Sequence, residues 1–409
     1  MAVPSVTLQN LLNRMNRWQT IYSIETQFKV SDLDDALRTI KRKHNLPFFQ
    51  KMGTIKIFQD VYIYRPPEDL DHMIFVDYPQ NDLPFGAHMR ARFTSLQQFW
   101  EDPDYRNDIA EIWDNGQLTL GIRNKTWENE QGITSQQIND ASSIEGYTTH
   151  DDAHDIRLDY VNYVTGSSSL AFNVIDSSGV ATVDNEFTSF NDPQYKRKWF
   201  FIWLYFSGLP SSVDLRFGVD SSNYLSKNVT EQFSGIPLTA NQWNLVAFDL
   251  NDADMTGLID EQSLFGWFSF SLNDAPSGEY NLDSSYLRGW ELANIWYYSK
   301  YAVKSEGATR ADKQYFVDPI TGEYNTNDAL VGEEPWADVV MYEAIMNGLT
   351  DEQNESVLPK MLAKRDEAWE KLAEIWPDMK QQVNTTRYRY DTDYSAPFDN
   401  GLGDWGMWV

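Results

Sequence analysis

The chain has 409 residues and a formal net charge of −28, from 33 basic and 61 acidic residues. An acidic surplus of this size argues against a broad basic surface that grips nucleic acid. The acidic charge suits a channel surface that repels the DNA phosphates, so that DNA passes without binding. The alternative is that the charge only keeps the protein soluble through self-repulsion. The absence of cysteine excludes disulfides, thiol catalysis and cysteine-ligated zinc.

Two amphipathic helices are predicted at the start of the chain. The first covers residues 5–20, with Ser5 as its cap. The second covers residues 31–43, where Ser31 and Asp34 form a capping-box-like start and three basic residues suit the C-terminal dipole. In the second helix one face is apolar, formed by Leu33, Ala36, Leu37 and Ile40.

Short hairpins follow these helices. Residues 54–58 alternate between polar and apolar side chains, and a second β-rich run at 61–64 ends at two prolines. A later pair of runs at 109–113 and 118–122 flanks an Asp-Asn-Gly turn, which is a hairpin signal.

This order of helix, proline break, hairpin and apolar strand resembles the head-to-tail adaptor proteins of tailed bacteriophages. The matching segments are residues 36–38, 47–49, 54–58, 64–67 and 70–76, and the resemblance continues to about residue 125. It implies an α+β body of helices with short β-hairpins. The alternative is a generic α+β segment.

The middle of the chain predicts an antiparallel β-sandwich. Residues 131–153 are polar and read as a linker. Strand-like runs then recur between turn residues, at 169–174, 181–183, 199–206, 213–219, 244–250, 265–272 and 292–298. Residues 164–172, 217–224 and 242–248 resemble a jelly-roll domain akin to carbohydrate-binding modules and galactose-binding-like domains. The basic triplet at 196–198 is expected to keep a strand edge soluble.

Helices return near the C-terminus. Residues 336–349 carry an apolar side, and so does a second helix that begins at about Asp351 or Val357 and reaches Trp376, where Pro377 stops or kinks it. They resemble the C-terminal helices of the same adaptor family, which makes the sandwich an insertion. If the two helical halves form one body, Leu33, Leu37 and Ile40 should pack near Ile345, Leu362 or Trp369.

The predicted organisation therefore has four parts. Residues 1–130 and 308–387 form the two halves of an adaptor body, residues 131–307 form the inserted sandwich, and residues 388–409 form an extended tail. The resemblance implies that this tail docks onto a portal ring; packing back onto its own domain is the alternative. Its aromatic residues are Tyr388, Tyr390, Tyr394, Phe398, Trp405 and Trp408.

No enzymatic motif stands out, and no catalytic residue is predicted. His150 and His154 have the spacing of a zinc protease, but their surroundings are loop-like and the usual glutamate is absent. Tyr224, Trp267 and Trp290 are candidates for stacking on a sugar ring, whereas Trp243 reads as a core residue. Asp220, Asp249, Asp252 and Asp254 are candidate calcium ligands; no other cofactor and no metal site is expected.

The leading expectation is a virion structural protein of the phage neck, made in the bacterial cytoplasm. As the resemblance implies, it would bind the portal protein and neighbouring tail proteins, form a ring with like subunits and extend the DNA channel. The alternative is a carbohydrate-binding adhesion or decoration protein of the virion. No signal peptide opens the sequence and no membrane partner is expected.

Overall fold

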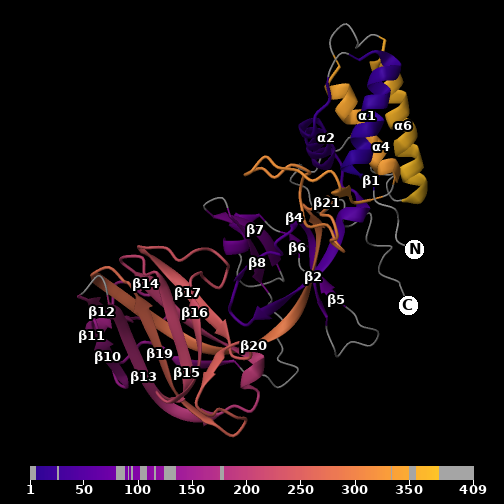
Figure 1. Ribbon diagram of the computed structural model, residues 1–409. Coiled ribbons are helices and arrows are strands. Elements are labelled where there is room, and N and C mark those ends of the chain that lie inside the picture. Colours follow the sequence, from indigo (N-terminus) through magenta and orange to yellow (C-terminus); the bar gives the residue numbers. More distant parts are fainter. Residues whose placement is uncertain are drawn as a thin grey trace. The chain divides into compact units, whose positions relative to one another are not determined.

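The computed structural model describes residues 6–24, 27–79, 88–90, 92–93, 95–101, 108–114, 117–123, 135–175, 179–332, 334–349 and 356–376. The chain divides into two compact units (Figure 1). The helical unit comprises residues 1–53, 67–74 and 295–409, and the sandwich unit comprises residues 54–66 and 75–294. In the described part of the chain, no helix is both long and apolar enough to span a membrane.

The helical unit joins helices from both ends of the chain. They are α1 (Leu8–Tyr22), α2 (Val30–Lys43), α4 (Glu334–Asn347) and α6 (Leu358–Ile375). Leu33, Leu37 and Ile40 of α2 are buried in one core with Ile345 of α4, and Trp369 of α6 packs against it. The predicted packing between segments about 300 residues apart is thereby confirmed, but it does not by itself indicate an adaptor.

Both helix starts differ from the predicted caps. The side chain of Thr7, not Ser5, accepts a hydrogen bond from the amide of Asn10 at the start of α1. Helix α2 begins at Val30, because the carboxylate of Asp32 accepts the amide of Lys29 at 2.7 Å. The predicted N-terminal residue Asp34 is instead buried.

The carboxylate of Asp34 holds the segment that precedes α4. It accepts the amides of Phe316 at 2.9 Å and Val317 at 3.1 Å. Burial raises the pKa of Asp34 to about 6, although the two amides oppose this shift. A folded-state pKa above the unfolded value means that the folded protein binds the proton more tightly. Asp34 therefore lowers stability above about pH 6, and this penalty disappears as the pH falls towards 4.

We predict that Asp34→Asn removes this contribution to the pH dependence of the free energy of unfolding. The stability of the wild type relative to the variant should rise by about 2 kcal/mol from pH 7 to pH 4, at about 1.4 kcal/mol per pKa unit. Urea unfolding of both proteins at the two pH values measures the difference. Asp35→Asn, which removes an exposed carboxylate one residue along α2, is the matched control. An equal difference at both pH values would contradict the assignment.

A small sheet completes the helical unit. It has the order β1-β22-β21, formed by Val6–Thr7, Ala329–Leu330 and Val303–Lys304. Tyr298, Ala302 and Val303 are buried in the helical core. The units therefore divide at residue 294 and not at the expected residue 307, because these three side chains are buried among the helices.

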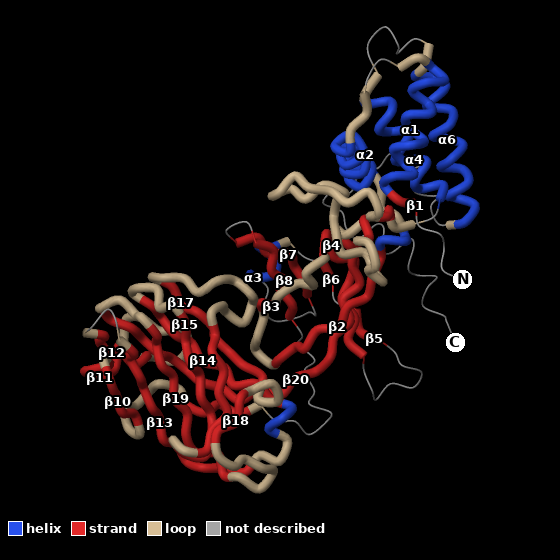
Figure 2. Tube along the Cα trace, viewed as in Figure 1, coloured by secondary structure: helices blue, strands red, loops and turns tan. Residues whose placement is uncertain are grey.

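Two antiparallel sheets form the sandwich of the second unit, and strands dominate it (Figure 2). One sheet has the order β10-β13-β19-β15-β16-β18 and the other follows the path β11-β12-β20-β14-β17. The first comprises Tyr147–Asp151, Val180–Asn191, Leu264–Asn273, Ser212–Asp220, Asn223–Val229 and Asp254–Thr256. The second comprises Ala153–Asp159, Ser169–Val174, Gly278–Ser299, Lys198–Phe206 and Gln242–Asp249.

The core of this unit is rich in phenylalanine. Alternate residues of a strand point to the same face of the sheet, and many of the inward-facing positions are phenylalanine. The chain passes repeatedly from one sheet to the other, which agrees with the predicted sandwich of jelly-roll type. The fully buried phenylalanines of the core are Phe172, Phe200, Phe206, Phe217, Phe265, Phe268 and Phe270.

The expected linker at 131–153 is partly strand. Within it lie β9 (Gln136–Asn139), which pairs with β20, and β10, which pairs with β13. The sequence did not predict these strands because their side chains are polar. Pairing with a neighbouring strand satisfies the backbone hydrogen-bonding groups whatever the side chains are. The triplet at 196–198 also differs from expectation, since Lys198 is buried against Asp192.

The remaining strands lie around residues 50–123. They are β2 (Gln50–Phe58), β4 (Leu70–Pro79) and β5 (His88–Arg90), and a four-stranded sheet of β3 (Ile63–Tyr64), β8 (Gln117–Arg123), β7 (Asp108–Asp114) and β6 (Arg92–Phe93). Helix α3 covers Leu96–Glu101. The predicted hairpin around Asp-Asn-Gly is confirmed as β7 and β8. Because residues 54–66 and 75–130 group with the sandwich, the expected domain of residues 1–130 is not a unit.

Candidate functional site

Two of the three predicted sugar-stacking residues lie together on the outer face of the six-stranded sheet. Gly218 pairs with Tyr224 on one side and with Trp267 on the other, and the two rings are 5.7 Å apart between centroids. The guanidinium of Arg216 lies 5.6 Å from the Tyr224 ring centroid. Trp267 is only 5% exposed. These rings already contact their neighbours, so they leave little open ring surface for a sugar.

Trp290 is not part of that group. It lies on β20, in the other sheet, with the ammonium of Lys56 at 4.8 Å and the guanidinium of Arg197 at 5.5 Å from its ring centroid. The structure therefore does not bring the three predicted residues to one surface. The six aromatic residues of the predicted docking tail lie outside the described residues.

The candidate calcium ligands have separate partners. Asp249 pairs with Lys56 at 2.7 Å, Asp252 pairs with Lys227 at 3.3 Å, and Asp220 accepts the amides of its own turn. Among the residues that the structure describes, no group of three or more acidic or histidine side chains could hold a metal ion. Calcium in the sandwich stays a prediction. His150 and His154 lie on β10 and β11, in different sheets, and not on a helix.

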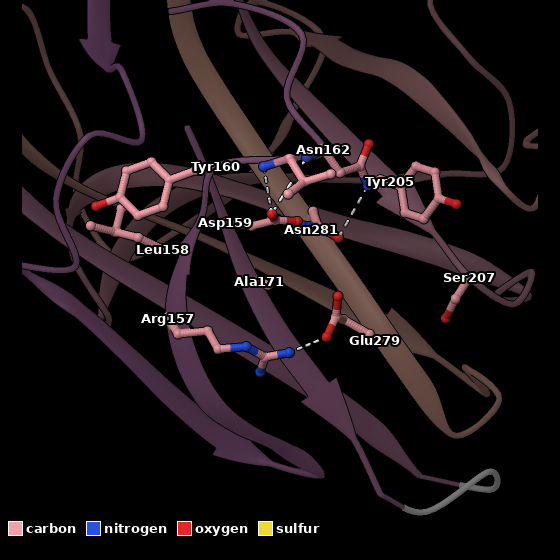
Figure 3. A pocket seen from close by; sticks show the side chains of 11 residues that line it. Arg157, Leu158, Asp159, Tyr160, Asn162, Ala171, Tyr205, Ser207, Glu279 and Asn281 are labelled. Carbon is pink, nitrogen blue, oxygen red and sulfur yellow. Dashed lines mark hydrogen bonds and ion pairs between the residues drawn. The ribbon is translucent and has the colours of Figure 1, made fainter. Parts of the chain in front are cut away.

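A hollow of about 610 Å³ opens on the outer face of the other sheet (Figure 3). Its base follows one row across four strands, because Ala171 pairs with Arg157 and Asn281, and Asn281 pairs with Tyr205. The small side chain of Ala171 leaves space between longer neighbours. The lining residues are Arg157, Leu158, Asp159, Tyr160, Val161, Asn162, Ala171, Tyr205, Ser207, Glu279 and Asn281.

Two tyrosines flank this hollow. Tyr160 and Tyr205 lie on opposite sides of Ala171 (Figure 3). Tyr160 is 66% exposed, and Tyr205 is half-buried with its ring edge-on to Trp243 at 5.7 Å. Each tyrosine combines an apolar ring with a hydroxyl group, which suits a ligand that is apolar on one side and polar at its rim.

The polar groups of the hollow form a connected network. The amide of Asn281 donates to Asp159 at 2.9 Å, and the amide of Asn162 reaches the side-chain oxygen of Asn281 at 3.5 Å. The indole of Trp243 donates to the side-chain oxygen of Asn162 at 3.0 Å. These groups are therefore held in fixed directions before a ligand arrives.

The charged groups of the hollow are few. Arg157 forms an ion pair with Glu279, drawn as a dashed line in Figure 3. Asp159 is the third charged residue of the lining. The lining carries more negative than positive charge, as does the whole chain. An anionic ligand would therefore be repelled, and an uncharged polar ligand fits better.

A second hollow, of about 650 Å³, has a different character. The lining rings of Phe58, Trp199 and Phe233 contact one another, with centroids 5.5–5.6 Å apart. The lining cations Lys56, Arg65 and Lys227 each pair with an acidic residue. Aromatic faces and charges that already have partners make this hollow a weaker candidate for a binding site.

Sequence reasoning missed the first hollow. One signal was present, since residues 159–163 read Asp-Tyr-Val-Asn-Tyr and place two tyrosines in a short polar stretch. Nothing local connects that stretch to Tyr205 or Asn281, because strand pairing alone brings these residues into one row.

Comparisons with known proteins give weak similarities. No family model matches the chain, and no curated protein matches it. Among solved structures, it is similar to the family 11 carbohydrate-binding module from Clostridium thermocellum in complex with a beta-1,3-1,4-mixed-linked tetrasaccharide, with a TM-score of 0.30 and 9% identity over 38% of this chain and 96% of that chain. A family 30 carbohydrate-binding module of a cellulosomal cellulase of Clostridium thermocellum has a TM-score of 0.30 and 13% identity over 38% of this chain and 97% of that chain.

A further similar structure is the enzymatically active domain of tailspike protein 4 of bacteriophage CBA120. It has a TM-score of 0.24 and 15% identity over 36% of this chain and 20% of that chain. The structural neighbours thus include carbohydrate-binding modules at low identity, and the resemblance to head-to-tail adaptors finds no support among them.

Proposed function

We propose that the sandwich unit binds an uncharged carbohydrate in the hollow beside Tyr160 and Tyr205. The observation that carries the proposal is the exposed ring of Tyr160 beside the hollow, with Tyr205 on the other side of a base formed by Ala171 and Asn281. A sugar ring has an apolar face that stacks on aromatic rings and hydroxyl groups at its rim that need hydrogen-bond partners. Asn162 and Asp159, which are both partly exposed, supply such partners beside the rings.

The acidic character of the site supports a neutral sugar. Glu279 is paired with Arg157, so the carboxylate of Asp159 is the lining charge without an ionic partner in the hollow. A uronic acid or sialic acid would bring a second carboxylate close to it. The expected ligand is therefore a neutral hexose.

The test is a glycan panel followed by calorimetric titration of the best ligand. We expect Tyr160→Ala and Tyr205→Ala to weaken binding by about tenfold to a hundredfold, which corresponds to about 1.4–2.8 kcal/mol. Tyr324→Ala is the matched control, because Tyr324 is 54% exposed but belongs to the helical unit. Tyr224→Ala tests the alternative face. Absence of binding to any neutral glycan, or loss of binding only in Tyr224→Ala, would refute this site.

The adaptor hypothesis, with its portal, ring and virion location, stays a prediction. Its proposed docking segment, residues 388–409, lies outside the described residues. Light scattering of the full chain, alone and mixed with a portal protein, would decide whether a ring forms.

A further inference from the structure

We infer that Asp283 is a positioning residue for the candidate site: it fixes the backbone of residues 159–165, which presents Tyr160 to the ligand. The inference rests on the proposed function for its effect on binding. Asp283 lies on β20 and is fully buried. It does not line the hollow, so any effect on a ligand must act through the loop.

The carboxylate of Asp283 accepts hydrogen bonds from the far end of this loop. One oxygen accepts the amides of Val164 at 2.6 Å and Thr165 at 3.0 Å. The other accepts the Thr165 hydroxyl at 3.1 Å and the amide and hydroxyl of Ser284 at 2.5 and 3.0 Å. Buried carboxylates are costly unless their oxygens accept hydrogen bonds, and the donors to Asp283 named above are all neutral. Two of these donors are backbone groups of the loop, so its path is tied to the sheet.

The near end of the loop is held separately. Asp159 accepts the amide of Val161 at 2.8 Å, and the Ser169 hydroxyl donates to the carbonyl of Asn162 at 2.6 Å. Between the two anchors, Tyr160, Val161, Tyr163 and Val164 are all exposed. Tyr160 and Val161 are mostly exposed, so burial of their side chains contributes little to holding this part of the loop. The hydrogen bonds at its ends therefore set its conformation.

A fixed loop favours binding because less conformational entropy is lost when the ligand arrives. We expect Asp283→Ala to weaken glycan binding about tenfold and to speed hydrogen exchange of the Val164 and Thr165 amides at least tenfold. Thr165→Val removes only the hydroxyl link and should give a smaller change in both measurements. This second variant decides the matter if Asp283→Ala does not fold.

Asp220→Ala is the matched control. Asp220 holds another turn of the same unit by accepting the amides of Ser222 at 2.8 Å and Asn223 at 2.9 Å. Its loss should leave both glycan affinity and the exchange of Val164 and Thr165 unchanged. Equal effects of Asp220→Ala and Asp283→Ala would show a general loss of stability and overturn the inference.

The two readouts separate failure of this inference from failure of the proposed function. If the wild type binds no neutral glycan, the proposed function is wrong, and the exchange rates alone decide whether Asp283 fixes the loop. If the wild type binds and both folded variants keep wild-type affinity, the positioning role is overturned. It is also overturned if exchange at Val164 and Thr165 does not change.

Discussion

Replacing Lys198 with methionine should lower the free energy of unfolding of the sandwich unit by about 3–5 kcal/mol. The side chain of Lys198 is 3% exposed and that of Asp192 is 8% exposed, with 2.6 Å between nitrogen and oxygen. Removing the cation leaves a buried carboxylate without its counter-charge. This cost exceeds what the pair contributes when both partners are present, because burial had already stripped both charges of water.

Chemical denaturation with a fluorescence readout measures the change, and a double variant tests its cause. Asp192→Leu combined with Lys198→Met removes both charges and should recover most of the lost stability. Lys227→Met is the matched control, because Lys227 pairs with Asp252 on the surface, where such pairs contribute about 0–1 kcal/mol. A Lys198→Met variant as stable as this control would contradict the buried-charge argument.

Trp336→Ala should destabilise the helical unit by about 3–5 kcal/mol. Trp336 of α4 is fully buried, with ring centroids 5.5 Å from Phe48, 5.9 Å from Phe49 and 6.3 Å from Trp369. Truncation removes a large apolar side chain and leaves a cavity between segments from opposite ends of the chain. Trp113→Ala is the control, because Trp113 is 64% exposed.

A double-mutant cycle can show that the two chain ends are energetically coupled. Phe49→Leu and Trp336→Leu should show a coupling energy of about 0.5–1.5 kcal/mol, the range for aromatic pairs. The two units can unfold in separate transitions, so each variant is assigned to the transition that it shifts. Strictly additive effects would mean that these rings do not stabilise the helical unit jointly.

Much of the local structure could be read from the sequence. The 3.6-residue spacing of Leu33, Leu37 and Ile40 predicted the buried face of α2, and the Asp-Asn-Gly turn predicted the β7–β8 hairpin. The strand-like runs at 199–206 and 265–272 are confirmed as β14 and β19. These features depend on neighbours a few residues apart, which is the range over which periodicity and turn chemistry act.

The candidate site depended on tertiary structure. The sequence indicated aromatic side chains suited to sugar, but Trp267 is covered by its neighbours and Trp290 lies in the other sheet. Tyr160 follows β11, and Tyr205 lies on β14. The two tyrosines flank one hollow because β11 pairs with β12, and β20 pairs with both β12 and β14. The sequence also did not predict that Lys198 and Asp283 are buried, since charged residues usually lie on the surface.

By itself, the sequence determined an acidic, cysteine-free chain with helices at both ends and a β-sandwich between them. Only the tertiary structure decided where the units divide, which aromatic rings stay open and which carboxylates are buried. The physical reason is that exposure and strand register depend on contacts between residues tens to hundreds of positions apart. Local patterns carry the preference of each segment for helix or strand, but not the identity of the neighbour that covers it.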